Sequence, residues 1–128
     1  MNNLQIIQEL YRAFREKDDD VFREICSPDI EWIQNEGFPG GATYRGAQAV
    51  IDNVFHAFNR DWETWQFQIE QYLEAGSTIV AIGVYRGIHR VSQKSFCAQA
   101  AHVYELATGK VVRFRQFADT KVIWDAIS

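Results

Sequence analysis

The chain has 128 residues, 47% of them hydrophobic, and its 13 basic and 17 acidic residues give a net charge of −4. A chain of this size can bury enough apolar surface to fold as one domain, residues 1–128, without a metal or a disulfide. The acidic balance argues against nucleic acid as a partner, and no apolar stretch approaches the ~20 residues of a membrane-spanning helix. The two cysteines lie far apart and the N-terminus has no secretion-signal pattern, so we expect a cytoplasmic protein without membrane contact.

Helical periodicity governs the start of the chain. Residues 3–17 predict an amphipathic helix, because their apolar side chains recur every three or four positions. These side chains are Ile6, Ile7, Leu10, Tyr11 and Phe14. An aspartate among residues 18–20 can cap a second short helix, which Ser27 and Pro28 end.

The middle of the chain passes from helix to strand. A short strand is predicted over residues 29–33, a glycine-rich loop over 34–46 and a third helix over 47–60. The apolar period then changes to that of strands. We expect alternating residues over 65–70, a turn at 75–77, and a β-branched and aromatic strand over 78–88.

Two further long strands are predicted within residues 96–119. They are joined by a turn at 107–110, where Gly109 can take the positive φ of a tight reversal. Because side chains alternate across a strand, both faces of this ribbon carry apolar residues, unlike a sheet with water on one side. A final short helix is expected over residues 121–127.

This order of elements indicates an α+β fold. We expect a curved antiparallel sheet, shaped as a cone, that is wrapped by the three N-terminal helices and followed by the short C-terminal helix. The outer face of such a sheet would also be apolar. We therefore expect a second copy of the chain to cover that face, giving a homodimer.

Six short segments together resemble the SnoaL-like and ketosteroid isomerase-like proteins of the nuclear transport factor two-like superfamily. They are residues 10–14, 28–32, 44–46, 87–89, 101–104 and 109–120, and they extend over nearly the whole chain. The resemblance implies the conical fold with an interior pocket. This fold hosts isomerases, cyclases, dehydratases and members that only bind, so function has to be argued from the site.

The resemblance also implies roles for particular residues. In the polyketide cyclases an aspartate near the end of the last strand is the general acid/base, and Asp119 resembles it. In ketosteroid isomerase one carboxylate moves the proton, while a tyrosine and a protonated aspartic acid hold the enolate oxygen. Here Gln34 stands at the position of the base and Ala101 lies near that of the second acid. Neither side chain can do those tasks, so steroid isomerisation by that mechanism is disfavoured.

Two residues are candidate catalytic groups, and each has a structural alternative. Asp119 at an apolar pocket rim can move a proton next to a carbonyl, but it also stands where it can cap the last helix. A pairing with Arg115 would lower the pKa of Asp119. His102 is either a hydrogen-bonding or proton-transfer partner in the pocket or a buried neutral imidazole.

Aromatic residues supply most candidate ligand contacts, although rings at these spacings also build ordinary cores. The candidates are Tyr11, Trp32, Phe58, Tyr85, Tyr104, Arg115 and Phe117. No His/Cys spacing fits a metal site, and the expected proton chemistry needs no cofactor. We expect a small apolar, carbonyl-containing or polycyclic ligand and cofactor-free, isomerase- or cyclase-like proton transfer by Asp119. The alternative is a non-catalytic ligand-binding or dimerisation module.

Overall fold

A six-stranded sheet in the order β2-β1-β6-β5-β4-β3 forms the framework of the computed structural model, which describes residues 1–128. The strands are β1 (Cys26–Ile33), β2 (Thr43–Arg45), β3 (Trp62–Ala75), β4 (Thr78–His89), β5 (Ser95–Ala107) and β6 (Lys110–Ala118). β1 runs parallel to β6, and the other neighbouring pairs are antiparallel. The four predicted long strands are confirmed. The prediction of loop over residues 34–46 is wrong at β2, which pairs with β1.

Local capping explains where the first two helices begin. α1 (Asn3–Glu16) starts at a capping box between Asn2 and Gln5, and it ends where Lys17 takes a left-handed φ of 56°. α2 (Asp19–Ile25) is capped by the Asp18 side chain, which accepts a hydrogen bond from the backbone N–H of Val21.

The third predicted helix is present but not regular. It consists of α3 (Ala47–Val50), the π-helical turn η1 (Ile51–Phe55) and α4 (His56–Asp61). A single π-turn inside an α-helix rotates the side chains that follow it, and such turns are frequent near functional sites. Here it turns Val54, Phe55 and Phe58 toward the interior of the fold.

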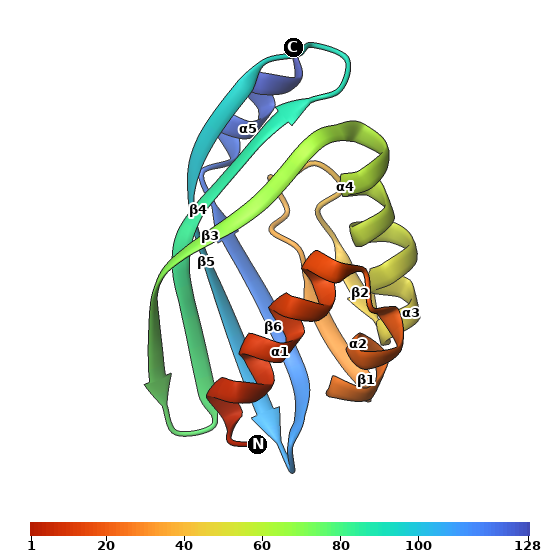
Figure 1. The fold of residues 1–128 in the computed structure, drawn as a ribbon, viewed down its shortest axis with the longest axis vertical. Coiled ribbons are helices and arrows are strands. Elements are labelled where there is room, and N and C mark those ends of the chain that lie inside the picture. The colour runs from red at the N-terminus through yellow and green to blue at the C-terminus, as the bar shows by residue number, and fades with distance from the viewer.

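The helices lie on the concave side of the sheet. Figure 1 shows the long strands bending around α1, with α2, α3 and α4 beside it. The last helix, α5 (Thr120–Ile127), packs on β5 and β4 at the end of the sheet away from the N-terminus. This arrangement confirms the predicted α+β cone. Each helix is too short or too polar to cross a membrane.

A bulge in β6 decides which of its side chains face the interior. Glu105 pairs with Arg113 and Leu106 pairs with Val111, so Val112 is an extra residue. Val111 and Phe114 are therefore both buried, although strict alternation would place them on opposite faces.

Candidate functional site

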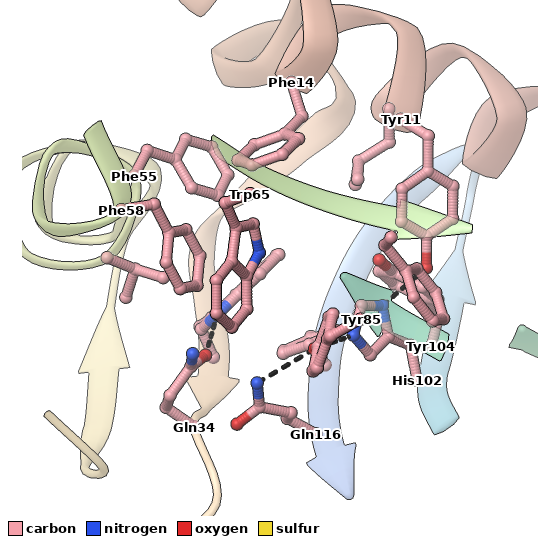
Figure 2. Close-up of a pocket in the computed structure, with 15 residues that line it drawn as sticks. Tyr11, Phe14, Gln34, Phe55, Phe58, Trp65, Tyr85, His102, Tyr104 and Gln116 are labelled. Atoms are coloured by element: carbon pink, nitrogen blue, oxygen red, sulfur yellow. Dashed lines mark hydrogen bonds between the residues drawn. The ribbon is translucent and has the colours of Figure 1, made fainter. Parts of the chain in front are cut away.

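The concave face and the helices enclose a cavity of about 40 Å³, shown with its lining side chains in Figure 2. The lining is mostly aromatic and contains no Asp, Glu, Lys or Arg. It consists of Leu10, Tyr11, Phe14, Trp32, Gln34, Val54, Phe55, Phe58, Trp65, Phe67, Tyr85, His102, Tyr104, Phe114 and Gln116. Among these, the imidazole and the two amides are the polar groups that accompany the tyrosine hydroxyls.

A chain of buried hydrogen bonds crosses this cavity from β6 to α1. The backbone N–H of Asn35 donates to Oε1 of Gln116 over 3.1 Å, and Nε2 of Gln116 donates to the hydroxyl of Tyr85 over 2.9 Å. Tyr85 is hydrogen-bonded to Nε2 of His102, and Nδ1 of His102 lies 2.6 Å from the hydroxyl of Tyr11. Figure 2 shows the bonds among Gln116, Tyr85, His102 and Tyr11 as dashed lines, which join side chains of β6, β4, β5 and α1. We call this set the polar chain.

The direction of the polar chain follows from its first bond. A backbone N–H can only donate, so the amide of Gln116 must turn its NH₂ group toward Tyr85. Tyr85 accepts this bond and has one proton left, and its remaining partner is Nε2 of His102. His102 then carries its hydrogen on Nδ1 and donates to Tyr11. The hydroxyl proton of Tyr11 is then free to turn toward the neighbouring hydroxyl of Tyr104 or toward a ligand.

Burial keeps every member of the polar chain uncharged. It lowers the pKa of His102 to about 3, because the imidazolium would lose its hydration inside an apolar wall. Burial raises the pKa of Tyr85 and Tyr11, and the neighbouring hydroxyl of Tyr104 raises that of Tyr11 further. The chain therefore offers neutral hydrogen bonds at physiological pH and holds neither an anionic base nor a cationic acid.

Aromatic rings pack closely on the other side of the cavity. Figure 2 shows Phe14, Phe55, Phe58 and Trp65 gathered opposite the polar chain. Phe58 stacks on Trp65 with ring centroids 4.4 Å apart, and Phe14 meets Phe55 edge-on at 4.9 Å. A cavity of about 40 Å³ holds only a few water molecules, since one needs roughly 10–15 Å³. The interior is thus too small for a polycyclic molecule with its rings in these positions.

A wider hollow of about 430 Å³ adjoins the cavity on the side of α1, α2 and α4. We call it the vestibule. Six residues line both spaces and form a shared wall, at which the two spaces meet. These residues are Tyr11, Phe14, Phe55, Phe58, Trp65 and Phe67. The vestibule adds polar side chains at its rim, and its size matches that of small-molecule sites.

The structure brings six of the predicted site residues together around the cavity. They are Tyr11, Trp32, Phe58, Tyr85, His102 and Tyr104. His102 is the buried neutral imidazole of its structural alternative, and it is also hydrogen-bonded within the cavity, while its role in proton transfer stays a prediction. Its ring nitrogens are occupied by two tyrosines from different elements. The functional roles of these six residues stay predictions.

Three predicted site residues lie elsewhere, and the expectation that Asp119 stands at the rim of the interior pocket is wrong. Asp119 and Phe117 are exposed on the outer face of the sheet beside Ala101, and Arg115 does not line the cavity either. The cause is the bulge at Val112, which reverses the alternation of β6 and turns its odd-numbered residues outward after that point. Asp119 also forms no ion pair with Arg115 and no side-chain cap on α5, although it precedes that helix.

Sequence reasoning missed Gln116, which sets the direction of the polar chain. Gln116 is 3% exposed on the face of β6 opposite Asp119, and a polar side chain beside the apolar Phe114 was the available signal. Gln34 is as deeply buried, and its Oε1 accepts a hydrogen bond from Nε1 of Trp32 over 3.0 Å. Gln34, which stands at the position where the resemblance places a base, thus orients the indole of Trp32.

Comparison with known proteins gives one family and many similar folds. The profile of the SnoaL-like domain matches residues 7–114. An NTF2-like protein from Burkholderia thailandensis is 34% identical with a TM-score of 0.95, and the match covers 100% of this chain and 98% of that one. An NTF2-like protein of unknown function from Burkholderia pseudomallei is 26% identical with a TM-score of 0.90 and the same coverage.

One structure with a named small molecule is also similar. TerC, co-crystallized with polyporic acid, is 21% identical with a TM-score of 0.87, and the match covers 98% of this chain and 97% of that one. At this identity the likeness concerns the fold. No curated protein sequence matches the chain.

Proposed function

We propose that this chain, which belongs to the SnoaL-like family, binds a small molecule through a carbonyl or hydroxyl oxygen that accepts a hydrogen bond from Tyr11. The observation that supports this proposal is the polar chain, whose direction turns the Tyr11 proton away from His102 at the edge of an apolar cavity, where the hydroxyl of Tyr104 is its neighbour. Apolar walls with a few converging polar groups are typical of small-molecule sites.

Binding is favoured over proton transfer because the cavity lacks a suitable base. Its lining has no carboxylate, and Asp119 lies on the opposite face of the sheet. An imidazole whose pKa is lowered to about 3 is too weak a base to remove a proton next to a carbonyl at neutral pH. We therefore propose a binding module, in place of the isomerase- or cyclase-like reaction expected from Asp119.

The two adjoining spaces suggest the shape of the ligand. The inner cavity of about 40 Å³ accommodates a small polar head, whereas the vestibule of about 430 Å³ accommodates a ring system. The aromatic rings between them can stack on a flat body. That TerC was co-crystallized with polyporic acid is consistent with small-molecule binding by this fold.

We also propose that the chain forms a homodimer through the outer sheet face. Phe117 is 49% exposed there, next to Ile82 and Ala101, and Nε of Arg115 is buried without a hydrogen-bond partner. Asp119 is an exposed carboxylate of the same face. In a two-fold interface an arginine of one copy can meet a carboxylate of the other.

Two free thiols, at Cys26 and Cys97, support a reducing compartment such as the cytoplasm.

Titration with acetophenone carrying ¹³C at its carbonyl tests the proposed contact. We expect saturable binding, with a downfield shift of the carbonyl resonance because the oxygen accepts the Tyr11 proton. Tyr11→Phe should weaken binding about three- to tenfold, the range for losing one neutral hydrogen bond. Tyr44→Phe is the matched control, since the Tyr44 hydroxyl donates to the carbonyl of Gly40 outside the cavity. Equal affinities for wild type and Tyr11→Phe would refute the contact.

Hydrogen–deuterium exchange at the acetophenone methyl group tests for the rival activity. A protein that moves protons next to a carbonyl would accelerate this exchange in D₂O, and NMR detects it without knowledge of the true substrate. We expect the rate of buffer alone. Acceleration by wild type that disappears in His102→Gln would replace the binding proposal with an enzymatic one.

A further inference from the structure

The rim of the vestibule carries two cations without partners. Arg15 and Lys17 line it from the end of α1, and neither forms an ion pair or a side-chain hydrogen bond. Arg12, one turn earlier, contrasts with them because it contacts Glu9, Glu16 and Asp18. Glu16 and Asp18, on either side of Lys17, are thus engaged by Arg12, and neither of them lines the vestibule.

The charge of the rim favours a single negative charge. Among the vestibule residues the other formal charge is Asp19, so two cations and one anion leave a net charge of +1. The negative end of the α1 dipole attracts cations and accounts for basic residues at this helix end. That attraction falls short of a full unit charge, so the rim keeps a net attraction for an anion, and a single carboxylate is enough to neutralise it.

The position of the cations relative to the polar chain defines the ligand further. Tyr11 and Arg15 are separated by one helical turn of α1, and Tyr11 lines both the inner cavity and the vestibule. The rings of Phe14, Phe58 and Trp65 line both spaces. A molecule that enters from the vestibule with its oxygen toward Tyr11 would have its other end beside the rim.

We propose that the vestibule binds a carboxylate, and that the ligand of this protein is an aromatic or other cyclic monocarboxylic acid with a carbonyl or hydroxyl at its far end. Arg15 and Lys17 hold the carboxylate, the rings of the shared wall contact the body, and Tyr11 donates to the far oxygen. This inference rests on the proposed function, which supplies the far contact, and adds the charge of the ligand and the residues that recognise it.

Two probes that differ only in charge test the inference. 4-Acetylbenzoate and 4-acetylbenzamide have nearly the same shape, and calorimetric titration at low ionic strength compares them. We expect the acid to bind at least tenfold more tightly than the amide. Arg15→Gln and Lys17→Gln should each remove part of that preference, and the double variant should remove it. Lys121→Gln is the matched control, because it removes one exposed positive charge at α5, outside the vestibule.

Titrations of Tyr11→Phe separate failure of this inference from failure of the proposed function. If acid and amide bind equally and Tyr11→Phe weakens both, the carboxylate site is refuted and the contact with Tyr11 stands. A preference for the acid that depends on Arg15 and Lys17 but is unaffected by Tyr11→Phe refutes the inner contact and retains the carboxylate site. Absence of binding by the acid refutes the inference, and absence of binding by both probes refutes the two together.

Discussion

At the scale of single residues, His102 shows how burial and hydrogen bonding assign a side chain its task. Its imidazole is 7% exposed and has a tyrosine on each ring nitrogen. Charging it would cost hydration and would turn Nε2 into a second donor facing Tyr85, whose remaining proton already needs an acceptor. The residue is thus held neutral. Because its Nε2 accepts the Tyr85 proton, its own hydrogen lies on Nδ1 and is donated to Tyr11.

The low pKa of His102 predicts a loss of stability in acid. An unfolded histidine takes up a proton near pH 6.5, whereas the folded one does so only near pH 3. The unfolded state therefore binds more protons between these values, so stability is complete above pH 6.5 and falls as the pH decreases. The slope is at most about 1.4 kcal/mol per pH unit.

Urea unfolding between pH 7 and pH 4.5 measures this slope. We expect it to flatten in His102→Gln, which has no group to titrate. Parallel curves for wild type and His102→Gln would contradict a depressed pKa at this site.

At the scale of secondary-structure elements, the curvature of the sheet depends on a close approach between β3 and β4. β3 bulges between Ile69 and Gln71, which pair with Gly83 and Ile82. A Cβ atom at Gly83 would lie 2.1 Å from the carbonyl oxygen of Gln68, so no larger residue fits while β3 keeps this course. Glycines and bulges at such points allow a strand to bend sharply.

Gly83→Ala is therefore expected to destabilise the fold by at least about 2 kcal/mol, because two backbones must separate to admit the methyl group. Gly37→Ala is the comparison. Its nearest neighbour would be the side-chain hydroxyl of Thr120 at 3.3 Å, which can move, and we expect a change within about 1 kcal/mol. The midpoints of urea unfolding of the two variants measure this difference. Similar midpoints would show that the close approach of β3 and β4 does not contribute to the stability of the fold.

At the scale of the whole molecule, the sheet has two apolar faces with different uses. The concave face holds the cavity and the polar chain. The outer face leaves Phe117 about half exposed and Arg115 Nε without a partner, which is unfavourable for a surface that meets only water. Association of two such faces would bury the ring and bring opposite charges together.

Sedimentation of the wild type at micromolar concentration should therefore give the mass of a dimer. Ile82→Lys introduces a charge into the centre of the outer face and should give a monomer. Val91 is 87% exposed in the turn between β4 and β5, so Val91→Lys places the same charge outside that face and should remain dimeric. A monomeric wild type would exclude the dimer, and a dimeric Ile82→Lys would place the interface elsewhere.

The sequence by itself determined the kind and order of the elements, because periods of 3.6 and 2 residues are local properties of the chain. The helix over residues 3–17, the four long strands and the α+β cone all followed from them. The π-turn and the short strand β2 could not be predicted in this way, because each contains too few residues to show a period of its own.

Only the tertiary structure decided which side chains meet in the interior. The extra residue Val112 moves every later side chain of β6 to the opposite face of the sheet. This bulge is set by pairing with β5 rather than by any local pattern. It moves Asp119 outward and Gln116 inward. The polar chain joins α1, β4, β5 and β6, whose residues are far apart in sequence. Such contacts arise from strand register and packing, which act over distances along the chain that periodicity does not reach.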